Sequence, residues 1–183
     1  MFTMNFIVWM FPVIFMIHDF EEIIMAEVWG CRYRKEISEV WPNRQPFGLN
    51  NMHFYKTPGI SIAVEVEFLL FSLISLFSVI FQSYFLWYSG FLGITLHLVF
   101  VHMLLCIRFR NYVPGVITSI IFILPNVWIL YLAQTIIRYD MRTILLSCLL
   151  GIILIIILIP MLHKAMGLWS KWLQKYSKTQ TKE

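Results

Sequence analysis

Three ionisable side chains lie close together inside the first apolar stretch of the sequence: His18, Glu21 and Glu22. Residues three and four positions apart share one face of a helix, so a helical His18 can face both carboxylates. An imidazole flanked by two carboxylates can bind a metal ion, relay protons or act as an acid–base pair. Each charge near a bilayer centre costs about 2.5–3.5 kcal/mol on insertion scales, and such residues commonly face a protein interior and serve a function.

The composition indicates that this stretch belongs to an integral membrane protein. Of the 183 residues, 60% are hydrophobic and 13% are charged, whereas a soluble domain is about 45–50% apolar and about 25% charged. The basic residues, which give a net charge of +4, lie at the edges of apolar segments, so nucleic acid is not an expected partner. Cys31, Cys106 and Cys148 are too scattered to indicate a disulfide framework.

Five apolar segments are long enough to be membrane-spanning helices, each of which needs about 20 residues. They cover residues 5–29, 58–82, 84–107, 113–137 and 142–166, with a polar connection after the first. The first segment lacks the basic leader and the cleavage site of a signal peptide and is expected to be retained. We therefore predict an all-α integral membrane bundle of about five transmembrane helices. It comprises one domain, residues 1–168, and a basic tail rich in Trp and Lys, residues 169–183.

The distribution of Lys and Arg predicts the orientation of this bundle. With five spans, the connection after the first segment, the connection after the third and the tail share one side. These regions hold most of the basic residues, and the opposite side holds only Arg138 and Arg142. By the positive-inside rule, the N-terminus is outside and the tail is cytoplasmic. The expected location is the cell membrane, as a multi-pass protein.

This orientation brings further polar residues to the depth of the first three. At a rise of 1.5 Å per residue, the second segment places Glu65 or Glu67 in the cytoplasmic half. The third segment places His97 or His102 there by the same argument. Only one member of each pair can point straight inward, because a helix turns by about 100° per residue; depth favours Glu65 and His102. Asn126, near the middle of the fourth segment, is a candidate supporting residue.

Two sequence blocks carry these residues in a recognisable order. The first is His18-Asp19-Phe20-Glu21-Glu22, which reads H-x-x-E-E. The second begins at His102 and continues with Arg110-Asn111-Tyr112-Val113-Pro114-Gly115 and Thr118. Together the blocks resemble the HXXEE family of small bacterial membrane proteins, whose second stretch reads H…R-x-Y-x-P-G-x-x-T. The resemblance implies a multi-pass membrane fold and functional weight for His18, Glu21, Glu22 and His102, with Arg110 and Tyr112 as further candidates. It implies no reaction, because the function of the family is unknown.

The favoured hypothesis is a metal-dependent intramembrane enzyme of hydrolase type that acts on a lipid or membrane-embedded substrate. His18, Glu22, Glu65 and His102 would bind a divalent metal such as zinc, manganese or iron. Glu21 would serve as the general base.

Two alternatives use the same residues. The first is a metal-free acid–base isomerase or cyclase of an apolar lipid, in which buried carboxyl groups donate protons. The second is a proton- or cation-coupled transporter, or an accessory protein that binds a lipid or peptide. The absence of an inverted repeat in the sequence counts against transport, although a homodimer would compensate for it.

Overall fold

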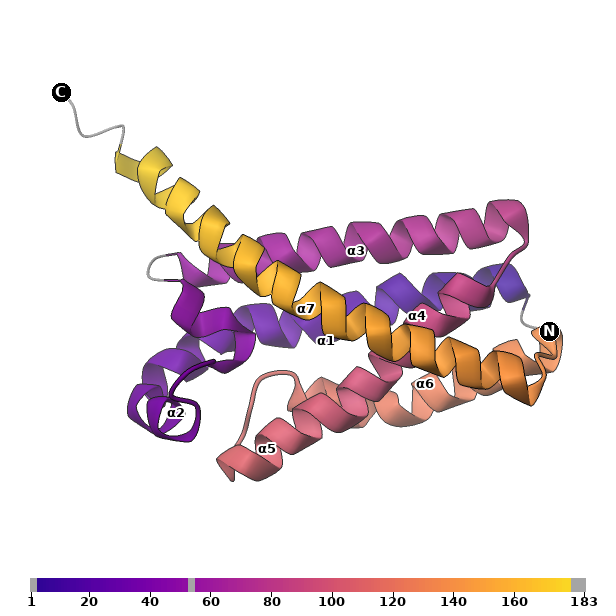
Figure 1. The fold of residues 1–183 in the computed structure, drawn as a ribbon, viewed down its shortest axis with the longest axis horizontal. Coiled ribbons are helices and arrows are strands. Elements are labelled where there is room, and N and C mark those ends of the chain that lie inside the picture. Colours follow the sequence, from indigo (N-terminus) through magenta and orange to yellow (C-terminus); the bar gives the residue numbers. More distant parts are fainter. Residues whose placement is uncertain (1–2, 53–54, 179–183) are drawn as a thin grey trace.

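The computed structural model describes residues 3–52 and 55–178 of the chain and shows an elongated bundle of long helices (Figure 1). In chain order its elements are α1 (Met4–Arg32), α2 (Arg34–Val40), the short 3-10 helix η1 (Pro46–Asn51), α3 (Lys56–Phe81), α4 (Phe85–His97), the π-helical turn η2 (Leu98–His102), α5 (Met103–Phe109), α6 (Val116–Ile137) and α7 (Met141–Lys178). No strand occurs in these described residues. The predicted all-α fold is confirmed.

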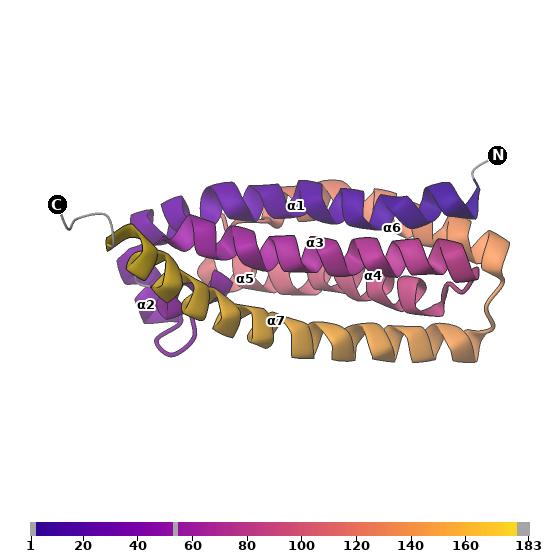
Figure 2. The ribbon, with the colours of Figure 1, turned by 90° about the horizontal axis from the view of Figure 1, so that it is seen from above.

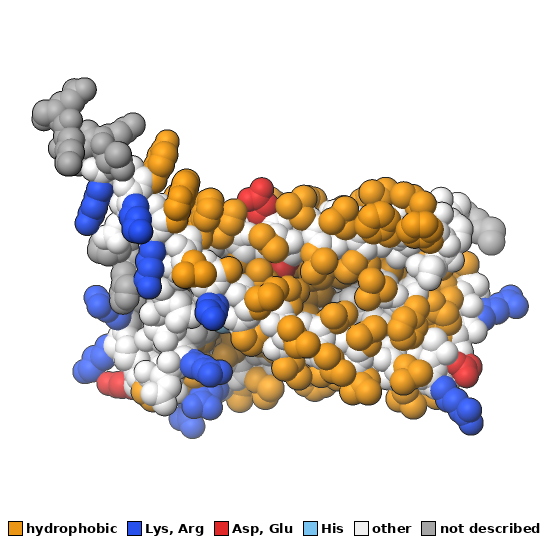
Figure 3. Space-filling model, turned by 45° about the horizontal axis from the view of Figure 1, so that its top comes forward, with side chains coloured by type: hydrophobic (Ala, Val, Ile, Leu, Met, Phe, Trp, Pro, Cys, Tyr) orange, Lys and Arg blue, Asp and Glu red, His pale blue; other side chains and the backbone are white. Residues whose placement is uncertain are grey.

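Four helical segments are long and apolar enough to cross a membrane: α3, the continuous run Phe85–Phe109, α6 and α7. They match the second to fifth apolar segments of the sequence. α1 is 29 residues long but carries four carboxylates, and it is not among these four. On the face drawn in Figure 3, hydrophobic side chains cover most of the surface between the two ends of the bundle, and Lys and Arg gather at the ends. The structure is therefore that of a membrane helical bundle with at least these four candidate spans.

A proline in α1 explains how α1 docks against its neighbours. Pro12 lacks an N–H group, so the Val8 carbonyl, four residues earlier, loses its helical partner. Two side chains from other helices donate to this carbonyl: Ser75 Oγ of α3 at 3.2 Å and Trp87 Nε1 of α4 at 2.9 Å. These two hydrogen bonds tie α1, α3 and α4 together at a buried point.

Two glycines set the path of α7. A Cβ atom on Gly93 of α4 would lie 2.7 Å from the Gly151 carbonyl oxygen of α7, so the two backbones approach closely. Beyond this crossing, α7 packs against α3 and η1 and has hardly any contact with η2 or α5. Figure 2 shows α7 turning toward the end of the bundle that carries α2, and Pro160 interrupts its hydrogen-bond ladder. The divergence of α7 from α5 leaves room for a cavity.

α7 continues as a helix through residue 168 into the predicted tail and reaches Lys178. Trp169, Trp172 and Tyr176 stack along its last turns, with ring centroids 4.7 and 5.5 Å apart. Residues 179–183 of the tail lie outside the described residues.

Candidate metal centre

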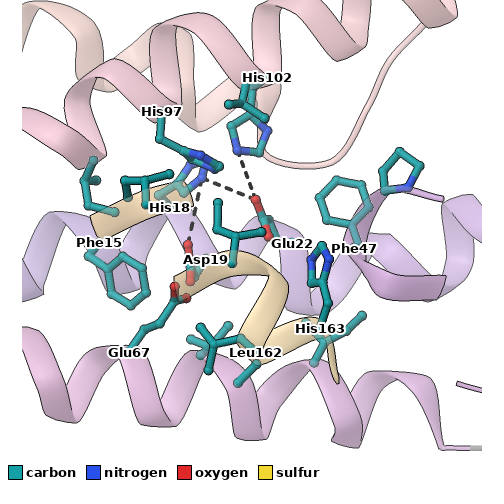
Figure 4. Close-up of a pocket in the computed structure, with 18 of the residues that line it drawn as sticks. Phe15, His18, Asp19, Glu22, Phe47, Glu67, His97, His102, Leu162 and His163 are labelled. Carbon is teal, nitrogen blue, oxygen red and sulfur yellow. Dashed lines mark ion pairs between the residues drawn. The ribbon is translucent and has the colours of Figure 1, made fainter. Parts of the chain in front are cut away.

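A cavity of about 260 Å³ lies between α1, α3, the α4–η2–α5 helix and α7, and residues of η1 line one part of it. Most of its lining side chains are apolar. Its ionisable lining residues come from four helical segments and face one another in Figure 4: His18, Asp19 and Glu22 of α1, Glu67 of α3, His97 and His102 of the α4–η2 run, and His163 of α7.

Three of these side chains, which we call the trio, converge on one point: His18, Glu22 and His102. Nε2 of His18 lies 3.4 Å and Nε2 of His102 lies 3.1 Å from the same oxygen, Oε1 of Glu22. The two imidazoles are almost fully buried, at 2% and 1% exposure. One possible ligand atom of each trio member lies within 4.8 Å of the other two, close enough for all three to hold one metal ion.

The other nitrogen of each imidazole is held by a defined partner. His102 Nδ1 lies 3.1 Å from the Pro114 carbonyl oxygen, which can only accept, so Nδ1 carries the proton. His18 Nδ1 lies 2.9 Å from Thr118 Oγ1. That hydroxyl donates its own hydrogen to Glu21 at 2.6 Å, and therefore accepts from Nδ1. In a neutral ring, each Nε2 then keeps a lone pair directed at the trio's centre, and neither Nε2 has a hydrogen-bond partner among the described residues.

Glu21 faces the start of α6 instead of the cavity. Its carboxylate accepts hydrogen bonds from Tyr112 Oη and the Thr118 backbone N–H, both at 2.8 Å, in addition to the Thr118 hydroxyl and the more distant Ile117 N–H. A carboxylate is well placed at a helix N-terminus. Burial and the bond to Glu21 hold the pKa of the Tyr112 phenol well above its usual range, so Tyr112 remains a donor. These contacts favour a positioning role for Glu21 over the general-base role expected from the sequence.

The structure corrects the preference for Glu65. Glu65 is exposed and does not line the cavity, whereas Glu67 does. The two residues point to opposite sides of α3 because two positions correspond to about 200° of rotation. The depth of a residue in the membrane predicts the right turn of this helix but carries no information about the rotation of the helix.

The expectation that only one histidine of α4–η2–α5 faces inward is wrong, because His97 and His102 both line the cavity. Their ring centroids are 5.1 Å apart. The residues from Leu98 to His102 form a π-helical turn, in which hydrogen bonds join residues five apart. This wider turn brings both imidazoles to one face.

The remaining predicted residues lie away from the trio. Asn126 is fully buried in α6 but does not line the cavity, and Arg110 is exposed at the end of α5.

Gly115 packs directly behind His102: its φ is +83°, and a Cβ there would lie 2.5 Å from His102 Cε1 and 3.0 Å from Glu22 Oε1. Asp19, His163 and Thr118 have no site role predicted from the sequence. Thr118 could have been found, because it ends the second sequence block.

The site thus joins the two sequence blocks, since His18 and Glu22 come from the first, and His102 and its support from the second. A family model described as a protein of unknown function with an HXXEE motif matches residues 9–131, which contain both blocks. The chain belongs to the HXXEE family. Comparison with curated proteins and with solved structures gave no match. The family resemblance is confirmed, and the function of this HXXEE protein has to be inferred from its site.

Proposed function

We propose that this HXXEE protein binds one divalent transition-metal ion through His18, Glu22 and His102 and is a metal-dependent membrane enzyme of hydrolase type. The observation that carries the proposal is the pair of buried Nε2 atoms directed at one carboxylate oxygen without hydrogen-bond partners. Two ligands bound at about 2.0–2.1 Å to a tetrahedral ion lie about 3.3 Å apart. The observed separations of 3.4 and 3.1 Å fit this value. Imidazole and carboxylate ligands suit zinc, manganese and iron.

The arrangement behind the ligands supports a metal better than an ion pair. Metal-binding histidines usually donate their second ring N–H to an oxygen acceptor, as His18 and His102 do. A metal-free ion pair would need protons on Nε2 as well. Each ring protonated in this way becomes an imidazolium buried against Glu22, and the cost of desolvating such a charge is several kcal/mol per ion.

Three protein ligands leave a coordination position open, as in catalytic metal sites. A bound ion would supply Lewis-acid activation of water and of an ester, amide or phosphoryl group. The carboxylates of Asp19 and Glu67 lie on the cavity wall beside the trio (Figure 4) and are the candidates for accepting or donating a proton. Glu21 fixes Thr118, and through it the ring of His18.

We further propose that α1 is a fifth span, with the N-terminus outside and α2, η1 and the tail on the cytoplasmic side. At 1.5 Å per residue, α1 is about 43 Å long, which exceeds the ~30 Å hydrocarbon core. Its carboxylates are turned inward or paired: Asp19 is buried, and Glu27 accepts a hydrogen bond from the Thr57 backbone at 2.8 Å. The number of Lys and Arg residues at the two ends of the bundle supports this orientation.

Metal analysis of the purified protein tests the proposed centre. We expect a stoichiometric zinc, manganese or iron ion in the wild type, and its loss in His18→Ala, Glu22→Ala and His102→Ala. His163→Ala is the matched control, because it removes an imidazole from the same cavity outside the trio, and it should retain the ion.

A wild-type protein that is folded by circular dichroism, contains no metal and takes up no added Zn²⁺, Mn²⁺ or Fe²⁺ would contradict the proposal. That outcome would favour metal-free acid–base chemistry on a lipid. Substrate-driven proton flux in liposomes would instead favour transport.

A further inference from the structure

The cavity has an apolar end that reaches the surface of the bundle. Val101 and Leu105 of the η2–α5 run and Ile155 and Ile159 of α7 line the cavity. The same four residues are only partly buried, so they also form part of the outer surface. We call them the rim.

The rim lies where α7 has separated from α4. After the close crossing at Gly93 and Gly151, α7 follows α3 and η1 and has hardly any contact with η2 or α5. The side chains just outside the rim are exposed and apolar, such as Leu104 at 61% and Ile156 at 65%. On the face drawn in Figure 3, hydrophobic side chains occupy most of the surface between the charged ends of the molecule. In a membrane, a rim bordered by exposed apolar side chains such as Leu104 and Ile156 faces hydrocarbon.

The interior beyond the rim suits one hydrocarbon chain. Phe15, Ile60 and Val64 line the cavity and are shielded from the outer surface. The volume of about 260 Å³ is close to the lower limit of about 300 Å³ for small-molecule sites, which favours a single chain over the two chains of a phospholipid.

The charges at the polar end restrict the group that this chain can carry. Among the described residues that line the cavity there is no Lys or Arg, whereas Asp19, Glu22 and Glu67 are present. A phosphate or diphosphate headgroup would therefore meet three carboxylates with no cationic side chain, and the single divalent ion proposed at the trio does not balance these carboxylates and the headgroup together. A neutral ester or amide group meets no such repulsion and can contact imidazoles and carboxyl groups.

We propose that the rim is a lateral entrance through which one hydrocarbon chain of a membrane lipid passes, so that a neutral ester or amide group on that chain reaches His18, Glu22 and His102. The substrate class rests on the proposed function, whereas binding of the chain requires only the cavity and its entrance.

Photolabelling tests this entrance. The probe is a palmitic acid methyl ester with a diazirine in its chain, added to the protein in phosphatidylcholine nanodiscs, with labelled residues located by mass spectrometry. We expect labels on Phe15, Ile60 and Val64, which lipid at the outer surface does not reach. Ile159→Trp should reduce these interior labels at least fivefold. Ile157→Trp, the same change at a 60% exposed position of α7, should leave them unchanged.

Competition tests the neutral group. Unlabelled methyl palmitate should displace the probe from the interior residues, and hexadecyl phosphate should do so at least tenfold less well. Equal competition by the two lipids would overturn the assignment of a neutral ester or amide.

Two results would overturn the entrance: interior residues that stay unlabelled in the wild type, or equal interior labelling in Ile159→Trp and Ile157→Trp when both variants are folded. These outcomes are distinguishable from failure of the metal centre. Interior labelling of a protein that binds no metal contradicts the metal centre alone, and a bound metal without interior labelling contradicts the entrance alone.

Discussion

At the scale of single residues, Thr118 fixes the orientation of the His18 ring. Its hydroxyl accepts from His18 Nδ1 and donates to Glu21, so it determines which ring nitrogen faces the trio. Thr118→Val keeps the shape of the side chain and removes both hydrogen bonds. Partners behind a metal ligand are typically worth 10–100-fold in metal affinity.

We therefore expect Thr118→Val to weaken Zn²⁺ binding by about 10–100-fold, measured by competition with a chelating dye. Thr118→Ser restores the hydroxyl and should bind within a few-fold of the wild type. Equal affinities of the Val and Ser variants would show that the hydroxyl does not support the site.

At the scale of the elements, the junction of α1, α3 and α4 depends on a single carbonyl. The Val8 carbonyl receives Ser75 and Trp87 in place of the N–H group that Pro12 lacks. Losing one donor leaves the other in place, whereas losing both leaves a buried acceptor unsatisfied, at a cost of about 1–3 kcal/mol.

We accordingly expect the Ser75→Ala, Trp87→Phe double variant to lose about 1–3 kcal/mol more unfolding free energy than the sum of the single variants. Denaturant titration in mixed micelles measures this difference, and the cycle cancels the packing lost from Trp87. In a Pro12→Ala background, the helix supplies its own N–H and the effects should add. Additivity in both backgrounds would contradict this account of the junction.

The π-helical turn η2 places His97 and His102 on one face by holding one more residue than an α-helical turn. Phe100, in the middle of η2, is 57% exposed. Deleting Phe100 should yield a continuous α-helix with the two histidines four positions apart, which again share a face.

We expect the Phe100 deletion to retain the metal ion. Insertion of an alanine after Phe100 should lose it, because the insertion rotates His102 by about 100° relative to His97. Metal content of the two purified, folded variants gives the comparison. Loss of the ion from the deletion variant, with retention in the insertion variant, would contradict the role of this turn in placing His97 and His102 on one face.

The site residues differ in how far the sequence could predict them. His18 and Glu22 follow from helical spacing in an apolar segment, and His102 follows from depth and from the second block. The π-helical turn leaves no trace in the hydrophobic pattern, so the shared face of His97 and His102 could not be predicted. Glu65 and Glu67 differ in depth by only about 3 Å, and the packing of α3 against α1 and α7 decides which of them faces the cavity.

Glu21 shows a second limit of prediction from sequence. Its spacing from His18 is as suitable as that of Glu22, and both lie on the same helix. The position at which α6 begins decides its partners, because the N–H groups of Ile117 and Thr118 have no helical acceptor and donate to the carboxylate instead. Where a helix ends relative to another helix is a property of the tertiary structure.

At the scale of the whole molecule, the Lys and Arg residues at the two ends of the bundle predict its orientation. If α1 crosses the membrane, Thr3 and Glu36 lie on opposite sides of it. Three spans, α3, the Phe85–Phe109 run and α6, separate residue 36 from residue 140, so Asp140 lies on the same side as Thr3. All three positions are exposed in the structure, so each can report its side as a single cysteine.

We expect an impermeant maleimide added to intact cells to label Thr3→Cys and Asp140→Cys but not Glu36→Cys, in a background with Cys31, Cys106 and Cys148 replaced. All three should react after lysis. Labelling of residue 140 without residue 3 would mean that α1 does not cross, and labelling of residue 36 alone would mean the reverse orientation. The metal centre is compatible with either orientation, since His18, Glu22 and His102 depend on packing within the bundle. The entrance between α5 and α7 needs only a bilayer around these helices, so its test is independent of which end is cytoplasmic.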